Sequence, residues 1–427
     1  MLDGPAWKRL LGGYIFVLTG NGIAGLMSFL ISVLLSRKMG VGEFGSYGLF
    51  FTLLTLVWQI PGFIDSAYVR YARAAAPEEA DDYLRVNLAF KARAWVCIIA
   101  AGPVAAYALS RWLFPGKASF GLLLMAFAGG AFLTFLASVL ANLQAREAYA
   151  GYSLANILFY GLALAVLFVL SRRAALLTPK AAAIVFLTAA VLTGTGAFVW
   201  LARKARPLRL LGPLNPAAAG KMRSLGRWIL WTGLLFIVLQ RIDMMIVGHF
   251  FTAEEVGVYT AASRLLAALT VFLTAAMALY LPKASLAPGS AAAWRSYKRE
   301  AALLTGIILI ILAGLVAAAP LMVSIFYGQA YAGAAAATRA LFLGHIPQAL
   351  ALPVSYLLYG LEDSFSNFLA MALALAANLA ANVILTPRLG VTGPGWSFGV
   401  GYTVYLIACV GALYWRRENR ERLERVR

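Results

Sequence analysis

The feature that most constrains the fold of this chain is a series of long apolar segments separated by short polar stretches. A helix that crosses a lipid bilayer needs roughly 20 mostly apolar residues, and twelve segments of the sequence meet that requirement. They are residues 14–35, 44–64, 92–110, 118–141, 152–171, 181–201, 228–250, 258–282, 301–326, 338–360, 365–386 and 394–415. Only 12% of the 427 residues are charged, about half the share found in soluble proteins. The sequence therefore predicts an all-α polytopic membrane protein.

The 36 lysines and arginines are unevenly distributed between the two sides that these spans define. With the N-terminus placed in the cytoplasm, 25 of them fall in cytoplasmic segments and 9 in segments on the opposite side. Cytoplasmic loops of membrane proteins carry an excess of basic residues, so we expect both termini in the cytoplasm. The net charge of +19 does not indicate nucleic-acid binding, because the cations cluster between apolar runs.

An internal repeat divides the chain into two halves. The sequence GVGEFGSYGLF at 40–50 follows the first apolar segment, and TAEEVGVYTAA at 252–262 follows the seventh. A second pair, LQAREAY at 143–149 and YGLEDSF at 359–365, follows segments four and ten. Two repeats that run in the same direction are typical of transporters built from two related bundles. We therefore predict two six-helix bundles with pseudo-twofold symmetry around a central cavity.

The predicted domain boundaries follow from this repeat. The N-terminal bundle covers residues 1–202 and the C-terminal bundle residues 228–415, with a basic tail at 416–427. A basic linker at 203–227 joins the bundles and contains seven cations and no acid. It is expected to be a cytoplasmic loop, and its charge also suits contact with anionic membrane lipids.

Several of these stretches resemble one family of membrane proteins. They are SRKMGVGEFGSYGLF after the first segment, QRIDMMIVGHFFTAEEVGVYTAASRL across segments seven and eight, and FYGQAYAGAA before the proline-containing tenth segment. They are similar to the polysaccharide flippases, which belong to the multidrug/oligosaccharidyl-lipid/polysaccharide exporter superfamily. The resemblance covers nearly the whole chain.

The resemblance implies a function as well as a fold. It implies a bacterial inner-membrane protein that moves an undecaprenyl-pyrophosphate-linked oligosaccharide from the cytoplasmic to the periplasmic leaflet by alternating access. Such a lipid-linked glycan would feed O-antigen, capsule or exopolysaccharide synthesis. A glycan polymerase and a chain-length regulator are then candidate protein partners. Neither a cofactor nor a metal is implied.

Three charged side chains fall inside the predicted seventh and eighth spans. Charges within a span are rare and usually face the interior of a helix bundle. Asp243 and Arg264 lie at similar depth on neighbouring helices, which predicts an ion pair between them. On a continuous helix Arg241 would point about 200° away from Asp243, so we expect it in a wet cavity where its guanidinium binds the pyrophosphate. The alternative is one buried network of these charges with Gln240 that touches no substrate.

Other polar residues are weaker candidates for the lining of the cavity. Arg70 lies just past the cytoplasmic end of the second segment. It either receives the pyrophosphate or is one of the basic residues that hold a cytoplasmic loop on its side of the membrane. Asn21, Asn142 and Asn156 either bond sugar hydroxyls or join helices to each other.

Two other functions compete with glycan-lipid transport. A cation-coupled multidrug exporter of the same superfamily calls for carboxylates in its cavity, and Asp243 is the only acid placed deep within a predicted span. A membrane glycan polymerase calls for catalytic or metal-binding acids on a large loop, but the loops are short and carry no nucleotide or metal motif. We therefore expect a transporter and no enzyme.

Overall fold

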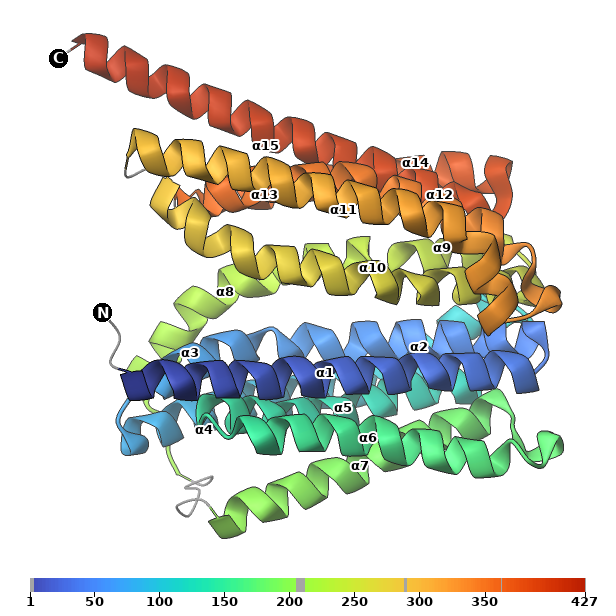
Figure 1. Cartoon of the computed structure of the whole chain (residues 1–427). Helices are drawn as coiled ribbons and strands as arrows, with labels where there is room; N and C mark the ends of the chain where they lie inside the picture. The colour runs from blue at the N-terminus through green and yellow to red at the C-terminus, as the bar shows by residue number, and fades with distance from the viewer. Residues whose placement is uncertain (1–3, 205–211, 288–289, 362, 427) are drawn as a thin grey trace. The chain divides into compact units, whose positions relative to one another are not determined.

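The computed structural model describes residues 4–204, 212–287, 290–361 and 363–426, and within these ranges the chain is helical with no strand (Figure 1). The α-helices are α1 (Gly4–Lys38), α2 (Val41–Gly62), α3 (Ile64–Ala74), α4 (Pro77–Ala108), α5 (Phe120–Ala145), α6 (Tyr149–Leu170), α7 (Pro179–Lys204), α8 (Pro216–Leu239), α9 (Ile242–Phe250), α10 (Ala253–Leu286), α11 (Ala291–Phe326), α12 (Ala334–Gly344), α13 (Ile346–Gly360), α14 (Ser364–Leu389) and α15 (Gly393–Val426).

The twelve predicted spans are all present as helices. Eleven stretches of the described chain are long and apolar enough to cross a membrane, and the last of them, Ser364–Arg416, contains both α14 and α15. Large apolar side chains such as Val104, Ile310 and Ile407 lie exposed on the outward faces of these helices. A soluble protein would bury such surface, whereas a bilayer solvates it. The chain is therefore a multi-pass membrane protein.

Three of the predicted spans are broken helices. The second span is interrupted at Phe63, two residues after Pro61 inside α2, and continues as α3. The seventh is interrupted at Gln240 and Arg241, between α8 and α9, and the tenth at His345, between α12 and α13. Proline lacks the backbone N–H that a helix needs. The first and third breaks each have a proline nearby, Pro61 inside α2 and Pro347 in the first turn of α13. The break between α8 and α9 contains no proline.

The described chain divides into two compact units, Met1–Ile237 and Val238–Arg427. In the first unit α1 packs on α6 and α5 packs on α2, α4 and α7; in the second α15 packs on α12, α13 and α14 (Figure 1). The boundary falls inside the segment that we predicted to open the second bundle at residue 228. Residues 205–211 of the predicted linker 203–227 lie outside the described residues.

The internal repeat has the same helical register in both units. Glu43 is the third residue of α2 and Glu255 is the third residue of α10. The tyrosines Tyr47 and Tyr259 follow one turn later, and both are buried. At α10 the repeat forms a capping box, in which Thr252 and Glu255 satisfy each other's backbone N–H groups. The two sequence stretches are therefore structural equivalents at the start of a span.

Candidate functional site

The break between α8 and α9 places a group of polar residues within the second unit. The α8 helix ends at Leu239, and α9 begins at Ile242 with Arg241 as its N-cap residue. The backbone N–H of Arg241 donates to the carbonyl of Val238 in a tight turn. Since the turn interrupts the helix, the side chains before and after it do not follow helical spacing. The break therefore sets the directions of Gln240, Arg241 and Asp243 locally.

The carboxylate of Asp243 is held by two neutral donors. The hydroxyl of Tyr259 on α10 donates to Oδ2, and the backbone N–H of Met244 donates to Oδ1 at 2.7 Å. The charge of Arg241 also attracts this carboxylate. The Asp243–Arg264 pair and the wet cavity around Arg241 stay predictions. Both assumed a continuous helix through residue 240, and the helix is interrupted there.

Arg241 lies within electrostatic range of a second arginine as well as of this carboxylate. Arg264 repels it, and Asp243 attracts it. Its Nε atom is buried and has no hydrogen-bond acceptor within the described chain. A buried guanidinium N–H without an acceptor is unfavourable unless a ligand completes it. The four predicted residues of this region lie together in the second unit, where Gln240 also contacts the hydroxyl of Tyr402 on α15.

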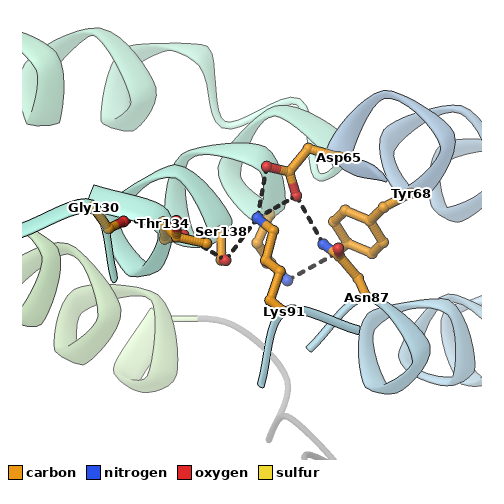
Figure 2. A network of polar contacts seen from close by, with 8 residues as sticks. Asp65, Tyr68, Asn87, Lys91, Gly130, Thr134 and Ser138 are labelled. Carbon is orange, nitrogen blue, oxygen red and sulfur yellow. Dashed lines mark hydrogen bonds and ion pairs between the residues drawn. The ribbon is translucent and has the colours of Figure 1, made fainter. Parts of the chain in front are cut away.

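A second polar cluster lies in the first unit, and the sequence analysis did not single it out (Figure 2). Lys91 on α4 donates to both carboxylate oxygens of Asp65 on α3, each at 2.6 Å, and to Ser138 Oγ on α5 at 2.8 Å. Asn87, one turn before Lys91, donates its amide to Asp65 Oδ1 at 2.9 Å. The side chain of Lys91 is only 4% exposed and that of Asp65 15%. These residues form a buried ion pair that joins three helices.

The sequence analysis named Asp243 as the only acid deep within a predicted span, and it did not anticipate the largely buried carboxylate of Asp65. Asp65 lies in a candidate span that runs from Val41 to Ala74, because α3 extends the second span beyond its apolar core. The signal in the sequence was a lone acid and a lone lysine, each beside an apolar segment, and hydropathy alone places such residues in a loop.

The remaining predicted site residues lie elsewhere in the first unit. Asn142 is buried, donates to Tyr68 Oη at 2.9 Å and accepts from Arg146 Nε at 2.9 Å. Asn156 on α6 donates to Asn21 on α1 at 3.5 Å, so these two amides join neighbouring helices. Arg70 on α3 is exposed. Of these four residues, Asn142 contacts Tyr68, which lies beside the Asp65–Lys91 cluster in Figure 2.

No group of three or more histidine, cysteine or acidic side chains in the described part of the chain could hold a metal ion. Beside the carboxylates of Asp243 and Asp65, the candidate residues carry guanidinium, ammonium, amide and hydroxyl groups. Such groups bind anions and hydroxyl-rich ligands through charge-assisted and neutral hydrogen bonds.

Comparison with solved structures identifies the fold. The chain is similar to a lipid II flippase, MurJ, in an inward closed conformation, with 14% identity, a TM-score of 0.72 and coverage of 94% of this chain and 87% of that one. It is similar to an inward-facing multidrug resistance MATE transporter of the MOP superfamily, with 18% identity, a TM-score of 0.74 and coverage of 94% and 96%. It is also similar to a MOP superfamily transporter from Pyrococcus furiosus described as having a binding pocket of reversed polarity, with 18% identity, a TM-score of 0.63 and coverage of 96% and 95%.

A search of curated proteins finds no match. A family model described as polysaccharide biosynthesis protein matches residues 34–336, which is more than half of the chain. The protein therefore belongs to this family of polysaccharide biosynthesis proteins, and it has the fold of the multidrug/oligosaccharidyl-lipid/polysaccharide exporter superfamily.

Proposed function

We propose that this protein flips an undecaprenyl-pyrophosphate-linked oligosaccharide from the cytoplasmic to the periplasmic leaflet of the bacterial inner membrane, by alternating access. The glycan serves a cell-surface polysaccharide such as O-antigen, capsule or exopolysaccharide. Both termini lie in the cytoplasm. The lipid-linked glycan and membrane lipids are its partners, and a polymerase and a chain-length regulator act on the delivered product.

The observation that carries this proposal is the arginine pair beside the helix break. Arg264 lies near enough to repel Arg241, and the attraction between Asp243 and Arg241 opposes this repulsion. Like charges close together within a membrane are unfavourable unless an anion joins them. A diphosphate supplies two negative groups and several acceptor oxygens, so it matches both the charge and the buried Nε donor of Arg241.

The rival function, export of cationic drugs, is favoured by one observation. Asp65 is a buried carboxylate in a candidate span, as a cation exporter requires. Lys91 already neutralises that carboxylate from within the protein. The carboxylate is therefore not exposed to a cationic cargo, and the glycan-lipid proposal is the better supported of the two.

The test is transport in a bacterial strain that lacks its own flippase and carries this chain with the matching glycan synthesis genes. Lipid-linked glycan in the outer leaflet is measured by its access to a membrane-impermeant lectin. We expect Arg241→Ala to lower the transport rate roughly 10- to 100-fold, since a hydrogen bond to a charged group contributes about 1.5–3 kcal/mol. Arg241→Lys keeps the charge and should retain part of the activity.

The matched control is Arg388→Ala, which removes an exposed arginine at the end of α14 and should leave transport unchanged. Protein level in the membrane is measured for each variant. If Arg241→Ala inserts normally and transports at the rate of the unchanged protein, then Arg241 is structural and the proposal loses its mechanism. Drug resistance conferred by the unchanged protein, with no glycan transport, would favour the rival.

A further inference from the structure

The Asp65–Lys91 cluster has the composition of a cation site. Three oxygens surround the ammonium of Lys91: both carboxylate oxygens of Asp65 at 2.6 Å and Ser138 Oγ at 2.8 Å (Figure 2). They come from α3 and α5, whereas the cation comes from α4. An ammonium group has three hydrogens and no acceptor, so these three contacts use all its donors.

The oxygens of the cluster are oriented by a chain of hydrogen bonds. The Ser138 hydroxyl donates its hydrogen to the carbonyl of Thr134 at 2.8 Å, and the Thr134 hydroxyl donates to the carbonyl of Gly130 at 2.7 Å. Because the hydrogen of Ser138 is used there, the oxygen presents a lone pair to Lys91. The serine therefore acts purely as a ligand oxygen toward the cation.

Asn87 adds a further oxygen to the cluster. Its amide nitrogen donates to Asp65 Oδ1, and its residue is fully buried. Its own Oδ1 atom is also buried and accepts no hydrogen bond within the described chain. Protein interiors rarely leave such an acceptor unsatisfied. The cluster thus has a buried amide oxygen beside its carboxylate that no donor in the described chain uses, which an ordinary ion pair does not require.

Hard cations prefer carboxylate, hydroxyl and amide oxygens as ligands. An ammonium group is close in size to a potassium ion that has lost its hydration shell. We propose that Lys91 is a built-in cation, which occupies an oxygen-lined site that would otherwise bind a monovalent cation from solution. The first unit therefore carries its own counter-charge and needs no sodium or potassium at this position. This inference does not depend on the identity of the transported cargo.

The experiment removes the built-in cation and asks whether a free one replaces it. Purified protein in detergent is heated in NaCl, KCl or choline chloride at equal ionic strength, and the melting temperature is recorded. Lys91→Met keeps the length of the side chain and removes the charge. We expect NaCl or KCl to raise the melting temperature of Lys91→Met by about 2–4 °C relative to choline, whereas the unchanged protein should melt at the same temperature in all three salts.

The control is the double variant Asp65→Asn with Lys91→Met, which removes the carboxylate as well and should show no preference for any cation. Three results would overturn the proposal. One is a Lys91→Met protein that is indifferent to the cation, another is a double variant that keeps the preference, and the third is a preference in the unchanged protein. If Lys91→Met cannot be purified even in KCl while the double variant can, a free cation does not fill the site and the proposal is wrong.

Discussion

The side-chain amide of Asn142 forms hydrogen bonds with two other side chains of the first unit. Its amide nitrogen reaches Tyr68 on α3, its oxygen accepts from Arg146, and Arg146 in turn lies 3.9 Å from the buried carboxylate of Asp81. This arrangement favours the second of the two roles considered for Asn142, joining helices, over contact with sugar hydroxyls.

The role of Asn142 can be tested by stability. Asn142→Ala removes two hydrogen bonds, one of them to a charged group, and should lower the free energy of unfolding by about 1–2 kcal/mol. Asn21→Ala is the matched control, because its single contact with Asn156 is 3.5 Å long and exposed, and such changes alter stability by less than about 0.5 kcal/mol. Equal melting temperatures for the two variants would show that the Asn142 contacts contribute nothing.

Hydropathy and charge explain why some residues of the site were found from the sequence and others were not. Arg241, Asp243 and Arg264 are charged residues inside apolar runs, so their cost in lipid marks them at once. Asp65 and Lys91 lie at the ends of apolar runs, where a charge is ordinary. Their pairing depends on the short helix α3, which follows the interruption at Phe63 and which a count of apolar residues does not predict.

At the scale of the elements, α12 and α15 approach each other through glycines. A Cβ atom added to Gly395 on α15 would lie 2.5 Å from the backbone of Ala340, and one added to Gly344 would lie 2.0 Å from the carbonyl oxygen of Gly395. Small residues allow membrane helices to pack this closely. The contact fixes α12, which precedes the break at His345, against α15.

The close approach predicts opposite effects of the same substitution at two positions of α15. Gly395→Ala should destabilise the protein, because the backbone of α12 must move to make room, and overpacking of this kind costs about 1–3 kcal/mol. Gly411→Ala should stabilise it by up to about 1 kcal/mol, since nothing lies within 4 Å of the added methyl group and alanine favours a helix over glycine. Thermal unfolding in detergent checks both, and destabilisation by Gly411→Ala would contradict the argument.

The spans themselves could be predicted because a bilayer imposes both length and apolar composition on any helix that crosses it. All twelve predicted segments are helical, and the repeat around Glu43 and Glu255 has one register. The breaks at Phe63, Arg241 and His345 could not be predicted in the same way. Membrane helices tolerate proline, and the break at residue 241 contains no proline that would mark it in the sequence.

At the scale of the whole molecule, the uneven distribution of arginine and lysine predicts how the chain is oriented. The connection before α8 and the one between α6 and α7 should lie on opposite sides of the membrane, the first in the cytoplasm. Leu214 and Arg173 are exposed positions in these two connections. Single cysteines at these positions, Leu214→Cys and Arg173→Cys, can report the side on which each lies.

The labelling uses a membrane-impermeant maleimide on intact cells, in a background in which Cys97→Ala removes the exposed native cysteine and the buried Cys409 is left in place. We expect Arg173→Cys to react in intact cells and Leu214→Cys to react only after the cells are opened. The background protein without a new cysteine measures any reaction of Cys409. The reverse pattern would place the basic connections outside, and it would then put the direction of transport in question, since a glycan made in the cytoplasm would meet the protein from its other side.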